Sequence, residues 1–214
     1  MKQPVIHAQR PWLLHACAGL WLIGVCAGMG VLLEYASTPG DPGRPPSTWP
    51  ADSTIPPPAG RPVLVMMAHP RCPCTRASLE ELGRLMADCR GRLDVDVVFY
   101  APAGAGEDWW KTDLWTSAAA IPGVVDLLDR DAAESHRFHA ETSGDVLLYD
   151  RNGRLEFDGG ITVARGHAGD NAGLAAIEAL VRGDTNVRRQ TPVFGCALND
   201  WAAVRTGAEG TWNR

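Results

Sequence analysis

The sequence predicts an α/β domain with a parallel sheet, preceded by one N-terminal transmembrane helix. Three features support this prediction: an uncharged apolar run, a Pro-rich segment after it, and a region where short apolar runs alternate with segments of helical periodicity. The chain has 214 residues, of which 45% are hydrophobic and 21% are charged, and this suits one globular domain with additional segments. The net charge of -5 argues against nucleic acid as a partner.

Residues 12–33 make up the apolar run, which contains no charged residue. A helix needs about 20 apolar residues to cross a bilayer, so we expect a single-pass anchor in the inner membrane. A cleaved signal peptide is the alternative, although the run exceeds the ~7–15 residues of a signal core and no clear A-x-A site follows it. A lipoprotein is disfavoured because branched Val25 precedes Cys26 where a small residue is expected, and Cys17 comes too early.

The charges on the two sides of this run predict its orientation. Lys2 and Arg10 precede the run without an acidic neighbour, whereas Glu34 and Asp41 follow it. This bias predicts that residues 1–11 lie in the cytoplasm and that the domain lies outside, in the periplasm of a bacterium. The periplasm is oxidising, so paired thiols there can form disulfides and take part in redox chemistry.

Residues 34–60 are expected to form a Pro-rich linker. Eight of the 16 prolines lie between Pro39 and Pro58. The polyproline II conformation, at ~3.1 Å per residue, predicts a spacer that holds the domain several tens of ångströms from the bilayer. The folded domain is then expected over residues 61–183, with a C-terminal extension over residues 184–214.

The folded domain begins with a predicted βαβ unit. Residues 62–69 are a short apolar strand, and leucines recur at helical spacing over residues 75–90. A second strand follows over residues 93–100, so a parallel sheet is expected. The remaining elements are a helix over 109–120, a strand over 124–128, a helix over 132–140, a hairpin of strands 146–149 and 154–157, and a helix over 171–182. Asp170 or Asn171 can cap this last helix, and Gly183 can end it.

Two cysteines, Cys72 and Cys74, flank a proline at the expected start of the first domain helix. With Cys72 as N-cap, Pro73 takes the first helical position, where its missing N–H is harmless. The helix N-terminus stabilises a thiolate, so Cys72 is predicted to be an exposed nucleophile. The alternative is two small loop residues without chemistry, but cysteines this close in an oxidising compartment favour redox or metal chemistry.

Other residues near this pair are candidates for supporting roles. Arg71 and Arg76 add positive charge, and His69 can pass protons or stabilise the thiolate. Cys89 continues the apolar face of the helix and is expected in the core. Cys196 lies past the last helix and is interpreted as a third redox thiol, a structural cysteine without zinc, or an intermolecular partner.

The sequence resembles the thioredoxin superfamily, especially its membrane-anchored branch similar to TlpA and AhpC/TSA proteins. The resemblance is carried by the stretch VLVMMAHPRCPCTRASLEEL, followed by LLDRDAAESHRFHAETSGDVLLYDRNGRLEF. The segments GGITVARGHAGDNAG and TPVFGCAL resemble more specifically the RedB-type proteins. The resemblance covers residues 61–198 and implies a thioredoxin-like fold, a central mixed sheet flanked by helices, with thiol-disulfide exchange as its activity. It also implies that Arg165 and His167 lie near Cys72. A solvated loop is the alternative for these two residues, and His136 and His139 are interpreted as ordinary surface residues.

The sequence departs from the thioredoxin pattern in two places. The cysteine pair is C-x-C where the family has C-x-x-C, and a disulfide closed over one residue is strained and therefore more oxidising. Thr142, Ser143 and Gly144 stand where the family carries a cis-proline that faces the cysteines, so the standard grip on a substrate is not expected.

The leading hypothesis is a membrane-tethered thiol-disulfide oxidoreductase that uses protein thiols or disulfides as partners and needs no organic cofactor. Cys72 attacks a partner disulfide, and Cys74 or Cys196 resolves the mixed disulfide. The alternative is a Cu(I)-binding or copper-delivery protein that uses His69, Cys72 and Cys74 as ligands. Peroxidase chemistry is disfavoured because His69 stands where a peroxide-reducing site has threonine, and a non-catalytic binding domain is the remaining alternative.

Overall fold

A computed structural model describes residues 11–198 of the chain. The predicted cytoplasmic segment with Lys2 and Arg10, and the last residues of the C-terminal extension, lie outside the described residues. The chain divides into two units, one ending at Ser37 and the other beginning at Thr38. Each unit is described by itself.

The first unit is the helix α1 (Pro11–Ser37). Its residues Trp12–Ser37 are long and apolar enough to cross a membrane, with a mean hydropathy of 2.1, and a signal sequence satisfies the same test. The helix continues four residues beyond the expected end at Leu33, and the Ser37 hydroxyl donates to the Leu33 carbonyl oxygen at 2.7 Å.

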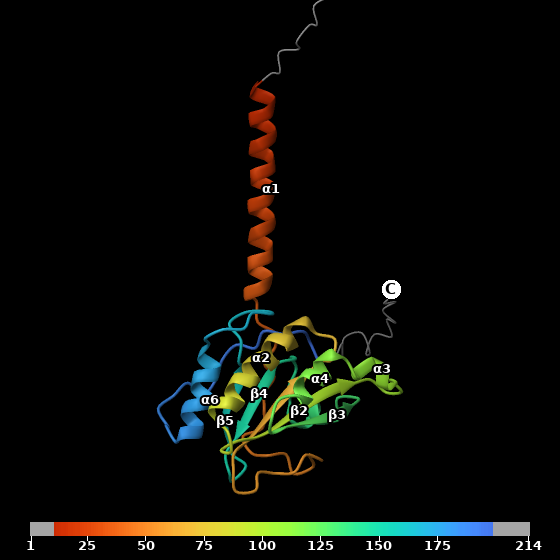
Figure 1. The fold of residues 1–214 in the computed structure, drawn as a ribbon, viewed down its shortest axis with the longest axis vertical. Coiled ribbons are helices and arrows are strands. Elements are labelled where there is room, and N and C mark those ends of the chain that lie inside the picture. Colours follow the sequence, from red (N-terminus) through yellow and green to blue (C-terminus); the bar gives the residue numbers. More distant parts are fainter. Residues whose placement is uncertain (1–10, 199–214) are drawn as a thin grey trace, which may run out of the picture. The chain divides into compact units, whose positions relative to one another are not determined.

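A five-stranded mixed sheet forms the centre of the second unit, with the strand order β3-β2-β1-β4-β5 (Figure 1). The first three strands in the chain are parallel to each other, and the last two run antiparallel to their neighbours. This arrangement is a thioredoxin-like fold, so the expected fold class is confirmed. The strands are β1 (Val63–Ala68), β2 (Asp94–Ala101), β3 (Val124–Arg130), β4 (Asp145–Tyr149) and β5 (Leu155–Gly160).

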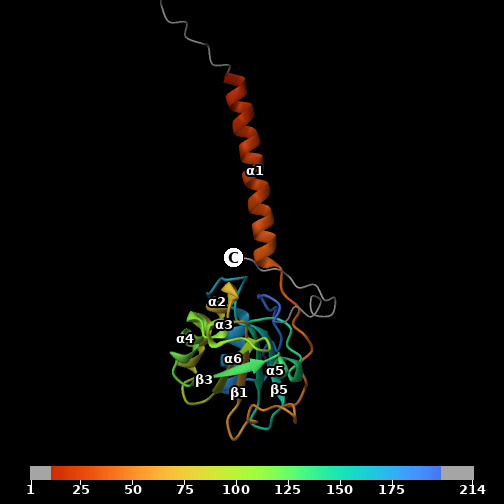
Figure 2. The same ribbon diagram turned by 90° about the vertical axis from the view of Figure 1, so that its right-hand side faces the viewer.

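Helices cover both faces of this sheet. On one face, side chains such as Leu82, Phe99 and Ile177 form a buried cluster beneath α2 (Pro73–Asp88), α4 (Asp113–Ala119) and α6 (Ala172–Arg182). Figure 2 shows α2 and α4 on one side of the sheet and the short α5 (Ala133–Arg137) on the other. The short α3 (Glu107–Trp110) follows β2. Cys89 belongs to the first cluster and is 3% exposed, as its place in the helical pattern predicts.

Two expected helices are shorter than predicted. The helix expected over 109–120 is interrupted at Lys111 and Thr112, because Thr112 is extended and its hydroxyl donates to the Pro70 carbonyl oxygen at 2.9 Å. The helix expected over 132–140 contains five residues, because Ala132 and His139 adopt positive φ angles of 57° and 52°.

The caps of the last helix agree with the expectation. Asn171 is the N-cap, and its side chain accepts a hydrogen bond from the Leu174 amide at 2.7 Å. Of the two expected caps, Asn171 and not Asp170 therefore caps the helix. Gly183 ends α6 in the left-handed region.

Residues 38–58, the strap, pack against the domain and do not form the extended spacer that their proline content predicts. The Trp49 ring meets the rings of Phe138 and Tyr149 edge-on, with both pairs of centroids 5.1 Å apart. Ile55 is 2% exposed, and Ser53 and Thr54 hydrogen-bond to the buried Glu134 carboxylate. Burying these apolar side chains stabilises the strap more than a solvated polyproline conformation would.

Residues 189–198, the arm, also pack on the domain. Gln190 pairs with Asp158 as a parallel bridge, and the Thr191 hydroxyl donates to the Gly160 carbonyl oxygen at 2.8 Å. Val193 is fully buried, and its carbonyl oxygen accepts from the amide of Gly40 in the strap at 2.8 Å. The arm therefore extends the β5 edge of the domain and returns Cys196 toward α2.

Candidate redox site

Cys72 lies at the N-terminus of α2, as the sequence predicts. It is the N-cap residue, with φ -88° and ψ 119°, and Pro73 follows at the start of the helix. The Cys72 amide donates to the His69 carbonyl oxygen, and the Thr75 amide donates to the Cys72 carbonyl oxygen, each at 3.1 Å. These bonds fix the turn between β1 and α2 and place the Cys72 side chain at the helix terminus.

The arm places Cys196 directly against Cys72. The two Sγ atoms lie 2.9 Å apart, although the residues are 124 positions apart in the chain. The six cysteines are free thiols in this structure. When Cys72 loses its proton, the Cys196 S–H group can donate a hydrogen bond to the thiolate.

Hydrogen bonding lowers the pKa of Cys72 from 9.0 to about 5. The largest cause is the hydrogen bond with the Cys196 side chain, and the backbone N–H groups of Cys196, Cys74 and Thr75 act in the same direction. Burial opposes them by raising the pKa. The expected arginines have other partners: the Arg71 guanidinium lies over the Trp109 ring, 4.9 Å from its centroid, and Arg76 forms an ion pair with Asp113.

The other two thiols remain protonated when Cys72 is a thiolate. Burial raises the pKa of Cys74, and the negative charge of Cys72 raises it further. The hydrogen bond with Cys72 raises the pKa of Cys196, and burial adds to this effect. The site therefore combines one thiol whose pKa is lowered with two thiols whose pKa values are raised.

The expectation that Cys72 is exposed is wrong. Its exposed fraction is 2%, that of Cys74 is 7%, and Cys196 is half-buried. Cys196 on the arm lies against Cys72, and this contact contributes to the burial of Cys72.

Ser143 connects the arm to the turn before α2. Its amide donates to the Cys196 carbonyl oxygen at 2.8 Å, and its hydroxyl accepts from the His69 amide at 2.8 Å. The Ser143 and Thr75 hydroxyls hydrogen-bond at 2.9 Å. Sequence reasoning missed Thr75 and Ser143 as site residues, and the signal for Ser143 was the Thr-Ser-Gly sequence at the expected proline position.

Arg165 and His167 lie on the loop that the resemblance placed beside the site, and the structure separates their roles. One Arg165 nitrogen, Nη1, donates to the Gly195 carbonyl oxygen next to Cys196, and Nε donates to the Thr38 carbonyl oxygen at 3.0 Å. The positive charge of Arg165 acts to lower the pKa of both Cys74 and Cys196. His167 is exposed, and its Nδ1 forms a hydrogen bond with the Arg165 carbonyl oxygen at 2.7 Å. This bond stabilises the turn and does not involve a thiol.

His69 packs among aromatic side chains beside the site. Its ring centroid lies 5.8 Å from that of Tyr100 and 5.6 Å from that of Trp109. Its Nδ1 accepts from the Arg71 amide at 3.1 Å. Burial lowers the pKa of His69, so the ring is neutral near pH 7 and adds no positive charge to the site.

The three ligands expected for Cu(I) do not form a cluster. Within residues 11–198, no group of three His, Cys, Asp or Glu side chains is placed so that it could hold a metal ion. Because Nδ1 of His69 is occupied by the Arg71 amide, the ring does not present this nitrogen to Cys72 and Cys74.

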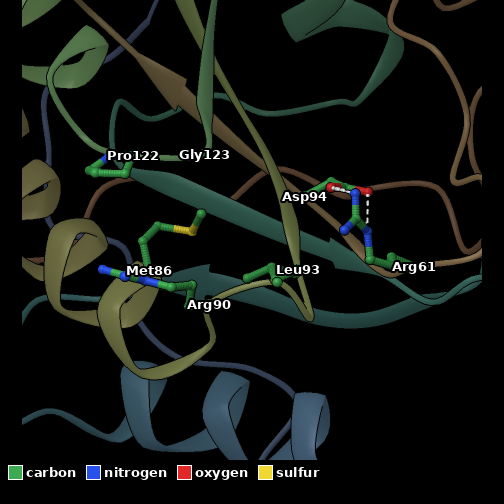
Figure 3. Close-up of a pocket in the computed structure, with 8 residues that line it drawn as sticks. Arg61, Met86, Arg90, Leu93, Asp94, Pro122 and Gly123 are labelled. Carbon is green, nitrogen blue, oxygen red and sulfur yellow. Dashed lines mark hydrogen bonds and ion pairs between the residues drawn. The ribbon is translucent and has the colours of Figure 1, made fainter.

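A surface cavity of about 450 Å³ lies beside the last turn of α2 and the start of β2 (Figure 3). Met86 and Leu93 line it, and Arg61 and Asp94 form an ion pair at its edge. Arg61 precedes β1, whereas Cys72 follows this strand. The cavity is therefore not the place where a substrate meets the thiols.

The chain has a thioredoxin-like fold with a cysteine pair at the N-terminus of a helix. No family model and no curated protein matches the chain. A hypothetical protein, SMc02350 from Sinorhizobium meliloti 1021, is 26% identical, has a TM-score of 0.54, and the match covers 65% of this chain and 79% of that chain. An uncharacterized conserved protein from Geobacillus kaustophilus is 18% identical, has a TM-score of 0.56, and the match covers 76% and 92%. A secreted Mycobacterium tuberculosis disulfide oxidoreductase homologous to E. coli DsbE is 14% identical, with a TM-score of 0.42 and coverage of 58% and 82%.

Proposed function

We propose that this protein is a thiol-disulfide oxidoreductase in which Cys72 is the nucleophile and Cys196 is its redox partner. The observation that carries the proposal is the position of the Cys196 Sγ atom, 2.9 Å from Cys72 Sγ at the N-terminus of α2. A thiol with a pKa of about 5 is a thiolate near pH 7, and a second thiol within reach can close a disulfide on it.

The reaction needs no group beyond the thiols and a client, the molecule whose disulfide is exchanged. The Cys72 thiolate attacks one client sulfur, forms a Cys72–client disulfide and releases the other client sulfur as a thiolate. Cys196 then loses its proton and attacks Cys72 Sγ, which forms the Cys72–Cys196 disulfide and releases the second client thiolate. The client gains two electrons and the protein loses two, and the same steps in reverse oxidise a client dithiol.

Between the two candidates for the resolving thiol, the geometry favours Cys196 over Cys74. A Cys72–Cys74 disulfide closes over a single residue and carries the strain of a short ring. Cys196 approaches from a separate segment, so a disulfide with Cys72 closes a long loop without that constraint. Cys74 remains available as a third thiol, in line with its raised pKa.

The finer features of the proposal come from the sequence. The apolar helix and the charges before it support a membrane-tethered domain in the periplasm. The resemblance to TlpA and RedB-type proteins supports protein thiols or disulfides as clients.

Disulfide mapping tests this proposal. The full chain, purified in detergent micelles, is equilibrated in glutathione buffers of graded potential and analysed by mass spectrometry. We expect a Cys72–Cys196 disulfide to form, and we expect exchange with a small dithiol to be lost in Cys72→Ser. The matched control is Cys89→Ala, a core cysteine whose removal should leave exchange intact. Exchange equal in Cys72→Ser and the unmodified chain would refute the proposal, and a Cys72–Cys74 disulfide alone would refute the role of Cys196.

A further inference from the structure

The arm occupies the position that a client cysteine must take. A disulfide can be attacked only by a sulfur in contact with it, and the Cys72 sulfur is in contact with Cys196 at 2.9 Å. Because Cys72 is 2% exposed, a client sulfur has no separate approach. The client and residues 195–198 of the arm therefore compete for one place.

Backbone hydrogen bonds hold the arm against the loop before β4. Thr142 and Ala197 form an antiparallel bridge, the Ser143 amide donates to the Cys196 carbonyl oxygen at 2.8 Å, and the Leu198 amide donates to the Glu141 carbonyl oxygen at 2.8 Å. When the arm leaves, the loop loses these partners, and buried backbone groups require replacement. An extended client segment can supply the same bonds, as in other cases of strand addition to an exposed edge.

The position before the cysteine has no space for a side chain. A Cβ atom on Gly195 would lie 1.8 Å from the Ser143 carbonyl oxygen and 3.2 Å from the Thr142 methyl group. The nearest atom belongs to the backbone of the loop, so it cannot rotate away. Arg165 also donates to the Gly195 carbonyl oxygen, and this fixes the backbone at that position.

The two positions after the cysteine differ from each other. Ala197 is exposed, so its side chain meets solvent. Leu198 is 1% exposed and belongs to the buried cluster that includes Val65, Met67 and Leu147. A segment in this register therefore needs an apolar residue two positions after its cysteine, and accepts many residues between them.

We propose that the clients of this site are extended polypeptide segments with the pattern Gly-Cys-x-apolar, which replace residues Gly195–Leu198 of the arm. This inference rests on the proposed function, because the client cysteine is the one that Cys72 attacks. Return of the arm to the same backbone groups then displaces the client segment and brings Cys196 back to Cys72. The arm is thus both the competitor of the client and the carrier of the resolving thiol.

Peptide disulfides test this pattern on the full chain in detergent micelles. The probe is the hexapeptide Val-Phe-Gly-Cys-Ala-Leu, the sequence of residues 193–198, with its cysteine linked to thionitrobenzoate. The Cys72 thiolate attacks the peptide sulfur, the sulfur–sulfur bond breaks, and thionitrobenzoate leaves with the electron pair and absorbs visible light. The comparison peptides have alanine for the glycine, aspartate for the leucine, or lysine for the alanine after the cysteine.

We expect the alanine-for-glycine and aspartate-for-leucine peptides to react at least about tenfold more slowly than the probe, and the lysine-for-alanine peptide to react within about twofold of it. The variant Leu198→Ala, which weakens the arm, should react faster with the probe than the unmodified chain does. Equal rates for the four peptides would overturn the client pattern. A small aromatic disulfide without a peptide separates this failure from that of the proposed function: if Cys72 does not react with it either, the proposed function is wrong.

Discussion

Removing the Cys196 side chain should raise the pKa of Cys72, and the replacement residue decides how far. The hydrogen bond with Cys196 is the largest cause of the low pKa of Cys72. In Cys196→Ala no side-chain donor remains at this position, and only the backbone N–H group is left. In Cys196→Ser a hydroxyl of similar size remains and can donate to the thiolate. The two variants therefore remove the same sulfur and differ in the hydrogen bond alone.

The size of the effect follows from the two pKa values. With a pKa of about 5, Cys72 is almost fully a thiolate near pH 7. With its ordinary value of 9.0, about one molecule in a hundred would be a thiolate at that pH. The backbone N–H groups that also lower the pKa stay in place in both variants, so we expect Cys196→Ala to lie between these limits. A rise of at least about one unit is expected, and a smaller rise for Cys196→Ser.

The same shift makes stability depend on pH, with a defined sign. The folded pKa of Cys72 lies below its unfolded value of 9.0, so the thiolate adds stability that is complete above 9.0 and is lost as the pH falls toward 5. The pKa of Cys196 is raised, so its contribution has the opposite sign and is lost as the pH rises above 9.0. Stability from this pair is therefore highest near 9.0.

The assay is the ultraviolet absorbance of thiolates as the reduced full chain is titrated with base, with Cys72→Ser as the blank. The first ionisation should move upward in Cys196→Ala and less in Cys196→Ser. Unfolding in urea at several pH values gives the second readout, and the slope below 9.0 should be smaller in Cys196→Ala. An unchanged first ionisation in Cys196→Ala would show that the helix terminus alone stabilises the thiolate, and the argument from the arm would fail.

Three further substitutions test the packing around the site. Trp49→Ala should lower the free energy of unfolding by about 3 kcal/mol, measured in urea, because the strap loses its ring contacts with Phe138 and Tyr149. Glu81→Ala should lower it by about 1 to 3 kcal/mol, because the Gly169 amide loses its acceptor and an arginine loses its ion pair. Burial, reinforced by the neighbouring Asp158 carboxylate, raises the pKa of Asp145 well above 3.8. The folded state therefore loses stability as the pH rises above 3.8, because Asp145 then ionises more easily in the unfolded chain. Asp145→Asn should reduce this loss and leave the part that comes from Asp96, Asp126 and Asp158, whose pKa values are also raised by burial. An unchanged slope from about pH 4 to 7 would contradict the assignment.

The fold was predictable from the sequence because its signals are local. The apolar run over residues 63–68 and the helical spacing of leucines in α2 report neighbouring positions in one element. The N-cap role of Cys72 was also predictable, since a proline directly after it fits the first helical position. The strap was not predictable, because proline content indicates an extended chain but does not indicate that Trp49 and Ile55 have apolar surfaces to pack on.

The site was only partly predictable, because its central contact joins residues far apart in the chain. Cys72 and Cys196 are separated by 124 positions, and no periodicity connects them. The burial of Cys72 follows from this contact, and the expectation of an exposed nucleophile considered only the turn and the helix. The backbone bonds from Ser143 and Glu141 to the arm have no side-chain signature at all.

Once this contact is known, the four residues of the arm become informative. Gly195 stands where a Cβ atom would collide with the loop backbone, Cys196 meets Cys72, Ala197 faces solvent and Leu198 is buried. Each residue type matches the requirement of its position. An arm that only covered the site would not need a thiol in contact with Cys72. The same requirements apply to any other segment that presents a cysteine to Cys72 in this register. The sequence of the arm therefore predicts which client segments the site can accept.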